Sequence, residues 1–327
     1  MKKIYLFFVL SSLIVAFSSC NDEWKDEQFE NFISFKAPLT HEGISDIYVR
    51  YRGDEKSTFQ QALIVSGSTV NEQDMTVNVE IDSDTLDILN YERFQNREDF
   101  YYKVLDSEYF SFPSTVDIKA GESTALMDID FTFKDIDLVE KWVLPLTVVD
   151  DPSSNYTANP RKHYRKALLR VNPFNDYSGT YSGTALKVVM EGYEDESPIV
   201  KDEITAYVVD ENTVFFYAGN IDEDRQDRRE YKIYATFNET GEVSFHADNP
   251  DIQFKVNKDA SYTVMEQMDA VRPYLLHRYT TINNIDYEFT DYTMVPNVDI
   301  RYKVSGSLIL ERQLNTQIPD EDQAIEW

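Results

Sequence analysis

The sequence predicts an all-β chain with two domains, because apolar and polar residues alternate along many short segments separated by turn residues. Alternation with a period of two places successive side chains on opposite faces of a strand. The pattern is clear at residues 33–36, 76–81 and 128–133, where Ile, Val and Phe alternate with polar residues. A chain of 327 residues is also long enough for two domains of ordinary size.

The first half of the chain is expected to form a β-sandwich over residues 31–172. It holds about seven or eight strand-like segments, and short strands at intervals of about 8–12 residues are typical of a sandwich. Besides the alternating stretches, these segments are residues 61–66, 115–119, 142–149 and 166–171.

One segment of the first domain departs from the strand pattern. Between residues 84 and 105, apolar residues such as Leu86 and Leu89 recur at helical spacing. Ser83 or Asp84 is suited to cap the N-terminus of such a helix. We expect this helix to cross between the two sheets of the sandwich.

Asn, Pro and Asp cluster at residues 171–176, so we place the domain boundary after residue 172. The second domain, residues 173–327, opens with a short tandem repeat at residues 177–184. About eight or nine antiparallel strands in this length fit a small barrel or a curled sheet. The strand-like segments are residues 185–191, 203–209, 213–217, 230–235, 243–245, 253–257, 280–286, 287–292 and 301–311.

Two parts of the second domain are less regular. Residues 251–279 lack a sustained strand pattern, and residues 265–271 have the spacing of a short helix or lid. The tail, residues 315–327, has the composition of an irregular acidic extension. We expect Ile325 and Trp327 to dock back onto one of the domains.

The net charge of the chain excludes one class of partner. The 31 Lys and Arg residues face 59 Asp and Glu residues, which gives a formal charge of −28. So negative a surface repels phosphate backbones, and no nucleic-acid partner is expected. The 42% of hydrophobic residues are too many for a disordered chain. The chain has only 10 glycines and contains no Walker or dinucleotide-binding motif. We therefore predict that it binds no nucleotide cofactor.

The first twenty residues have the pattern of a bacterial export signal. Lys2 and Lys3 precede an apolar run at residues 4–17, and Ser18 and Ser19 lead into Cys20. Small residues before a cysteine are typical of a lipoprotein cleavage site, at which the thiol receives diacylglycerol. A transmembrane helix needs about 20 apolar residues, so this run is too short to span a bilayer. We therefore predict a signal peptide over residues 1–19 and lipidation of Cys20.

Cys20 is the only cysteine in the chain, so its acylation would leave no thiol for a disulfide or a metal. Residues 20–30 are polar and acidic, as expected of a solvated tether between lipid and protein. Trp24 is expected to lie exposed in this tether. An acidic stretch after the lipidated cysteine resembles the signal that sends Bacteroidetes lipoproteins to the outer face of the outer membrane.

The sequence shows no catalytic or metal-binding motif, so we predict a protein that is not an enzyme. No serine-hydrolase elbow occurs, and acidic clusters such as residues 222–224 do not match the twelve-residue calcium loop. Bound calcium is left open. The two carboxylates of a glycoside hydrolase are placed by the fold and not by spacing, so this activity remains an alternative. The four histidines lack zinc-site spacing; they are His41, His163, His246 and His277.

Aromatic side chains are the best candidates for ligand contact. A flat ring stacks on the apolar face of a sugar, and exposed aromatic residues often mark a binding surface. The 22 tyrosines gather partly in the least regular segment of the second domain. Trp142, in contrast, lies in an apolar strand and is expected in the core. The candidate ligand-binding residues are Tyr274, His277, Arg278, Tyr279, Tyr287 and Tyr292.

Several short sequence segments, taken in their order along the chain, resemble a known family, the two-domain outer-membrane lipoproteins of Bacteroidetes. The resemblance implies an immunoglobulin-like sandwich at the N-terminus and a lipocalin-like or barrel-like domain at the C-terminus. It covers most of the chain after the tether. The segments are residues 84–91, 101–105, 116–122 and 142–146 in the first domain, and residues 176–183 and 302–312 in the second.

This family is associated with polysaccharide-utilisation systems, where such lipoproteins are similar in role to the SusE and SusF class of glycan-binding proteins. The resemblance therefore implies a lipid-anchored protein of the outer membrane, exposed at the cell surface, that binds oligo- or polysaccharide beside a transporter complex. Many anchored copies raise the local concentration of a weakly bound ligand. The alternative is a scaffold subunit of an outer-membrane complex that binds no sugar.

Overall fold

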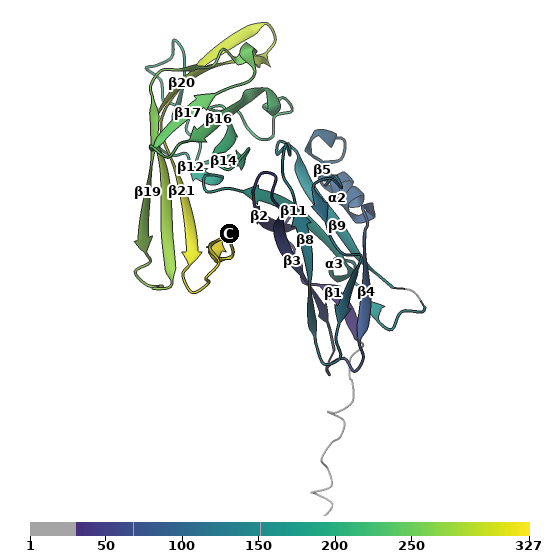
Figure 1. Cartoon of the computed structure of the whole chain (residues 1–327). Helices are drawn as coiled ribbons and strands as arrows, with labels where there is room; N and C mark the ends of the chain where they lie inside the picture. Colours follow the sequence, from purple (N-terminus) through teal and green to yellow (C-terminus); the bar gives the residue numbers. More distant parts are fainter. Residues whose placement is uncertain (1–30, 68, 151) are drawn as a thin grey trace, which may run out of the picture.

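The computed structural model of the protein describes residues 31–67, 69–150 and 152–327. Strands dominate both halves, so the predicted all-β fold class is confirmed. Figure 1 shows a sandwich-like part and a barrel-like part, with the C-terminus between them. The predicted signal peptide, Cys20 and the tether lie outside the described residues. Within the described ranges, no helix combines the length and apolarity needed to cross a bilayer.

Two sheets form the sandwich. The first sheet has the order β10-β1-β3-β8-β6. Its strands are β1 (Phe32–Phe35), β3 (Ser57–Val65), β6 (Phe110–Ser111), β8 (Thr124–Phe131) and β10 (Thr157–Ala158). The second sheet has the order β2-β11-β9-β4-β7, and β5 pairs with β9 beside this path. Its strands are β2 (Ser45–Arg50), β4 (Met75–Ile81), β5 (Tyr102–Val104), β7 (Thr115–Ile118), β9 (Lys141–Val149) and β11 (Lys166–Phe174).

The sandwich core follows from the alternation that predicts the strands. Leu63 and Ile129 of the first sheet face Val77 and Leu144 of the second, and all four side chains are buried in one cluster. Successive strand residues point to opposite faces, so Val143 next to Leu144 lies on the outer face of the second sheet. That outer face positions the candidate site. Residue 172, the predicted end of the first domain, falls within β11, and the boundary stays a prediction.

The predicted helix exists, but it does not cross between the sheets. Helix α2 (Asp84–Phe94) begins after Ser83 and connects β4 to β5, which both belong to the second sheet. Leu86 packs with Val143 and Leu168 in a cluster separate from the sandwich core. The helix therefore covers the outer face of the second sheet. The prediction of a crossover helix was wrong because β9 and β11 carry apolar residues on both faces, and the outer ones also need a cover.

The second domain is a closed barrel of eight strands, in the order β21-β12-β14-β15-β16-β17-β19-β20, in which β20 pairs back with β21. Short strands β13, β18 and β22 pair with the two long ones. The strands are β12 (Gly179–Ser182), β13 (Lys187–Met190), β14 (Glu203–Val208), β15 (Thr213–Tyr217), β16 (Lys232–Phe237), β17 (Glu242–His246), β18 (Lys255–Val256), β19 (Ala260–Met268), β20 (Leu275–Val295), β21 (Val298–Asn315) and β22 (Ile325–Glu326).

Large side chains fill the barrel. Tyr181, Tyr287, Phe289 and Tyr302 are each at most 2% exposed. The hydroxyl of Tyr287 accepts a hydrogen bond from the backbone N–H of Gly219, at 3.1 Å. The remaining short helices of the chain are η2 (Glu98–Phe100), α3 (Lys162–Arg165), η3 (Arg228–Tyr231), η4 (Pro250–Ile252) and α4 (Glu321–Ala324).

Two expectations for the second domain were wrong. Residues 265–271 form no helix: Met265 and Met268 lie in β19, and Met265 pairs with Tyr279 of β20. Their three-residue spacing mimics a helical turn, although both side chains are exposed at the end of a strand. The segments 280–286 and 287–292 are parts of one long strand, β20. A bulge near Asn284, whose φ is 59°, interrupts the alternation without ending the strand.

The tail is more regular than expected, and it docks as predicted. After α4, strand β22 pairs with β21, and Ile325 is buried. The ring of Trp327 stacks on Tyr48 of β2, with centroids 4.0 Å apart and 2° between the planes. Asp322 forms an ion pair with Arg50, also on β2. The tail therefore leaves the barrel and holds the outer face of the second sandwich sheet.

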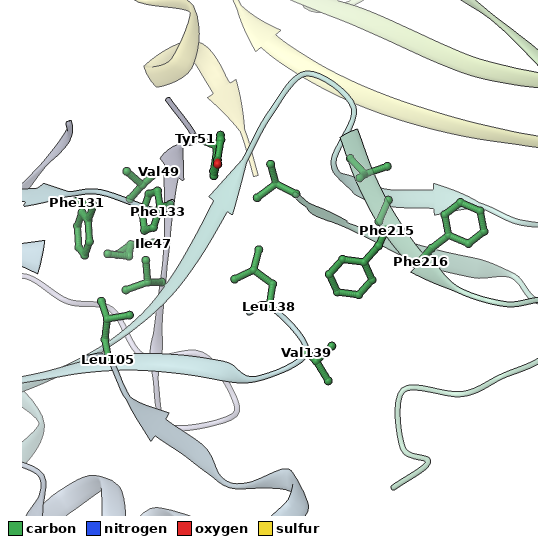
Figure 2. Close-up of a cluster of buried hydrophobic side chains, with 14 of the residues drawn as sticks. Ile47, Val49, Tyr51, Leu105, Phe131, Phe133, Leu138, Val139, Phe215 and Phe216 are labelled. Atoms are coloured by element: carbon green, nitrogen blue, oxygen red, sulfur yellow. The ribbon is translucent and has the colours of Figure 1, made fainter. Parts of the chain in front are cut away.

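Besides the tail, an apolar contact at the loop before β9 joins the two domains. Leu138 and Val139 lie in the loop before β9 and are buried, and Figure 2 shows them between the sandwich core and Phe215 of β15. Arg228 of η3 adds a hydrogen bond to the carbonyl oxygen of Val139, at 3.3 Å. The domains are thus held at this loop and at the tail, and also where Arg97 and Asp99 near η2 bind residues 224–228.

Leu138→Ala is expected to destabilise the protein by about 2–3 kcal/mol, because it opens a cavity at the domain contact. Leu126→Ala is the matched control: Leu126 is 55% exposed on β8, against 8% for Leu138, and the change should stay within about 0.5 kcal/mol. Urea unfolding of both variants measures this difference. Equal destabilisation would contradict the buried position of Leu138.

Candidate functional site

A cavity of about 440 Å³ lies between the two domains. Ligand sites are frequently found at domain interfaces and have volumes of roughly 300–1,000 Å³. The lining comes from the second sandwich sheet on one side, from β12, β14 and β15 of the barrel on the other, and from the tail. We call it the interdomain cavity.

The floor of the interdomain cavity is the outer face of β2 and β11. Ile47 and Val49 of β2 are buried in the sandwich, so Asp46 and Tyr48 between them point outward. Strand β11 pairs with β2 in parallel, which places Arg170 beside Asp46 and Asn172 beside Tyr48. Register alone therefore brings these four side chains together.

Charged and amide groups of the floor bind one another. The Asn172 amide donates to a carboxylate oxygen of Asp46, at 3.0 Å. The Arg170 guanidinium lies 3.8 Å from Asp46 and 3.5 Å from the carboxylate of Glu42. Planar polar groups held in this way are pre-positioned for hydrogen bonds to a ligand.

Apolar covers close the two ends of the floor. At one end, α2 packs on Ile44 and Leu168. At the other end, Trp327 lies against Tyr48 and, with its ring centroid at 4.8 Å, against the edge of Phe174. The interdomain cavity lies on the part of this sheet face between the two covers, and the tail forms part of its lining.

The barrel side of the cavity supplies two tyrosines, a carboxylate and a guanidinium. Tyr207 and Tyr217 lie on β14 and β15, and Glu223 and Arg228 follow in the next loop and in η3. Burial raises the pKa of Tyr217 to about 12, although Arg228 opposes the shift. Burial, together with Glu223, also raises the pKa of Tyr207 well above its usual value. Both phenols therefore stay protonated and can donate hydrogen bonds at neutral pH.

Lys141, at the start of β9, brings a half-buried ammonium group to the cavity. Burial, and then the nearby Arg170, lower its pKa. Trp142 beside it is only half-buried, and its indole N–H donates to the carbonyl oxygen of Asp137, at 2.8 Å. The expectation of a core position for Trp142 therefore holds in part, because the residue packs on the core and also lines the cavity.

A second cavity, of about 760 Å³, adjoins the interdomain cavity across the tail. The two cavities share lining residues, among them Ile325 and the stacked rings of Tyr48 and Trp327. Trp327 is 51% exposed and Tyr48 is 38% exposed. Stacking covers the ring faces that are turned to each other, and the rest of the two rings is accessible aromatic surface at the junction of two hollows. Such surface suits the flat face of a sugar ring.

The structure places the predicted ligand-binding residues elsewhere and does not bring all of them together. His277 and Tyr279 share the outer face of the β20 sheet with Glu311, whose carboxylate lies 2.6 Å from the His277 ring. Glu311, and then Asp269, raise the pKa of His277. Arg278 points to the opposite face, where it forms ion pairs with Glu266, at 2.7 Å, and with Glu321 of the tail.

The remaining three predicted residues are separate from that group. Tyr274 lies in the turn before β20, where its carbonyl oxygen accepts a hydrogen bond from the Thr316 N–H. The Tyr292 hydroxyl accepts one from Asn249, at 3.2 Å. Tyr287 fills the barrel interior with no exposed surface, so its prediction as a ligand contact was wrong. The other five residues stay predictions.

The residues of the interdomain cavity were missed because no motif connects them. The outward direction of Asp46 and Tyr48 was readable from their alternation with Ile47 and Val49. Their partners come from β11, from the barrel and from the last residue of the chain, and only the fold unites these segments. Among the described residues, no group of three or more His, Cys, Asp or Glu side chains could hold a metal ion.

Comparison with known proteins places the chain. Residues 24–152 match a domain of unknown function (DUF4973), and residues 165–309 match a second family described as a C-terminal domain. A Bacteroides ovatus protein of unknown function is 45% identical, with a TM-score of 0.83, and the match covers 90% of this chain and 100% of that one. The chain belongs to this family of two-domain Bacteroides proteins.

Other members of the family have solved structures. An auxiliary nutrient binding protein from Bacteroides thetaiotaomicron is 46% identical, with a TM-score of 0.80, and the match covers 91% of this chain and all of that one. A second Bacteroides ovatus protein, described as a multidomain protein including DUF1735, is 44% identical, with a TM-score of 0.82, over 90% of this chain and all of that one. No curated protein matches the chain. The family thus shares both domains of this fold.

Proposed function

We propose that the protein binds oligo- or polysaccharide in the interdomain cavity, without catalysis, as an accessory of a glycan-uptake system. The observation that carries this proposal is the pair of accessible rings, Tyr48 and Trp327, beside the fixed polar groups of the cavity floor. Aromatic rings stack on the apolar face of a sugar, while carboxylate, amide and guanidinium groups bind its hydroxyls. The relative described as an auxiliary nutrient binding protein supports the proposal.

Trp327→Ala and Tyr48→Ala are each expected to weaken glycan binding by roughly 1–3 kcal/mol, by analogy with nucleobase stacking on aromatic rings. Trp327→Phe keeps a ring and should retain most of the affinity. Calorimetry against the polysaccharide that the parent binds, chosen by affinity electrophoresis on a panel, measures the change.

Two further variants make this test specific. Tyr91→Ala, at a 65% exposed position on α2, is the matched control and should bind as the parent does. Tyr279→Ala tests the site predicted from the sequence. If Tyr279→Ala lost binding while Trp327→Ala did not, the site would move to the outer face of the barrel. If the parent bound no glycan at all, the alternative of a scaffold subunit would replace sugar binding.

The proposal includes a lipid anchor at Cys20 and a position at the outer-membrane surface, beside a transporter complex. The support is the sequence pattern of the first twenty residues and the acidic stretch after Cys20. In Figure 1 the chain enters the sandwich at the end remote from the barrel. A tether attached at residue 31 would therefore leave the interdomain cavity clear of its own anchor.

Palmitate labelling in the native host tests the anchor. The parent chain should incorporate radioactive palmitate and remain in the membrane fraction, whereas Cys20→Ala should do neither, because the acylated thiol is gone. Protease added to intact cells should degrade the parent if it faces outward. Equal labelling of the two chains would contradict the anchor.

A further inference from the structure

We infer that the glycan bound in the interdomain cavity carries an anionic group, a carboxylate or a sulfate, and that Lys141 is the counter-charge that selects it. This inference rests on the proposed function and adds a ligand class to it. It starts from the charges that line the cavity, taken one by one with the groups that already neutralise them.

The acidic groups of the cavity are mostly paired. Asp46 binds Asn172 and faces Arg170. Glu140 forms ion pairs with Lys103, at 3.0 Å, and with Arg229, at 2.6 Å. Glu311 is bound by His277 on the outer face of the barrel. The acidic side chains of the lining without an ion pair in the described parts of the chain are Glu223 and Glu326.

Two cations of the lining form no ion pair with a carboxylate in the part of the chain that the structure describes. Arg228 is 6% exposed and donates to the backbone carbonyl oxygens of Arg225, Asp99 and Val139, at 3.1–3.4 Å. Its guanidinium also faces the Tyr217 hydroxyl.

Lys141 has no hydrogen-bond or ion-pair partner anywhere in the described ranges, and it is half-buried beside Arg170. The carboxylates of Glu223 and Glu42 act on it only through space, without an ion pair. An ammonium taken partly out of water next to another cation is unfavourable without a carboxylate in direct contact.

An anionic ligand group would remove that penalty. It would accept hydrogen bonds from the Lys141 ammonium and face Arg170 and Arg228 from two walls of the cavity. Glu223, on the barrel wall next to the Tyr207 hydroxyl, has carboxylate oxygens that can also accept hydrogen bonds from ligand hydroxyls. The formal charge of −28 on the whole chain works against acidic glycans elsewhere on the surface. Binding of an acidic glycan therefore needs local cations without carboxylate partners, such as Lys141 and Arg228 in the cavity lining.

The test uses native affinity gels and calorimetry at 0.15 M salt, where the Debye length is about 8 Å and surface repulsion is short-ranged. The acidic probes are polygalacturonate, alginate, hyaluronan and chondroitin sulfate; the neutral ones are galactan, arabinan, xylan and mannan. Uronate polymers and sulfated polymers distinguish the two anionic groups. A bound uronate polymer is compared with its methyl-esterified form, which keeps the sugar and removes the charge.

Lys141→Gln should lower affinity for the acidic glycan by about 10- to 100-fold, as expected for loss of a hydrogen bond to a charged group. Lys103→Gln is the matched control. Lys103 lies on β5, where it pairs with Trp142 of β9, and it forms an ion pair with Glu140. It does not line the cavity, so its variant should bind as the parent does. Thermal melting checks folding, and Lys141→Gln should melt at or above the parent temperature because an unpaired charge is removed.

The outcomes separate this inference from the proposed function. The inference and the proposed function are both supported if the protein binds an acidic glycan, if Lys141→Gln weakens that binding, and if methyl esterification or desulfation of the glycan abolishes it. Binding of a neutral glycan alone, unchanged in Lys141→Gln, overturns the inference and leaves the proposed function intact. If the parent and Lys141→Gln bind an acidic glycan with equal affinity, the role of Lys141 as the counter-charge is contradicted. No binding to any probe overturns both.

Discussion

The outer face of the second sandwich sheet determines how this molecule is assembled. Strands β2, β9 and β11 bury one face in the sandwich core, yet their outward residues include Val143, Leu168 and Phe174, which also need to be covered, as does Ile44 just before β2. Helix α2 covers one end and the C-terminal tail the other. Between the two covers the outward residues are polar, and the barrel stands over them. The interdomain cavity is the consequence.

The tail therefore has two roles in the fold. It continues the barrel through the pairing of β22 with β21, and it fixes the barrel on the sandwich through Trp327 on Tyr48 and Asp322 on Arg50. The opposite junction, at Leu138, is apolar and buried. Two attachments on either side of a hollow hold its walls at a defined distance, and a preorganised site loses less entropy on binding.

Much of the fold was predictable because alternation is a local property. The strand predicted at residues 213–217 matches β15, and α2 begins where Ser83 and Asp84 indicate. The errors arose where spacing has two explanations. Met265 and Met268 are three apart on an exposed strand, and the bulge at Asn284 resembles a strand end. The burial of Tyr287 was readable from its alternation with Asp286 and Glu288, whereas tyrosine abundance pointed to a binding role.

The candidate site was less predictable, because its residues meet only through long-range contacts. Register places Arg170 beside Asp46, and closure of the tail brings the last residue of the chain to the first domain. Neither the parallel pairing of β2 with β11 nor the docking face of the barrel is encoded in a short motif. The predicted group around His277 does form a contact with Glu311, which borders the interdomain cavity, but His277 and Tyr279 themselves do not line it.

Hydrogen–deuterium exchange with and without a bound glycan tests the central claim most directly. If the ligand occupies the interdomain cavity, peptides that cover β2, β11 and residues 320–327 should exchange more slowly in the complex, and the hairpin of β19 and β20 should not change. Slowed exchange confined to residues 262–281, with β2 and the tail unaffected, would contradict the account.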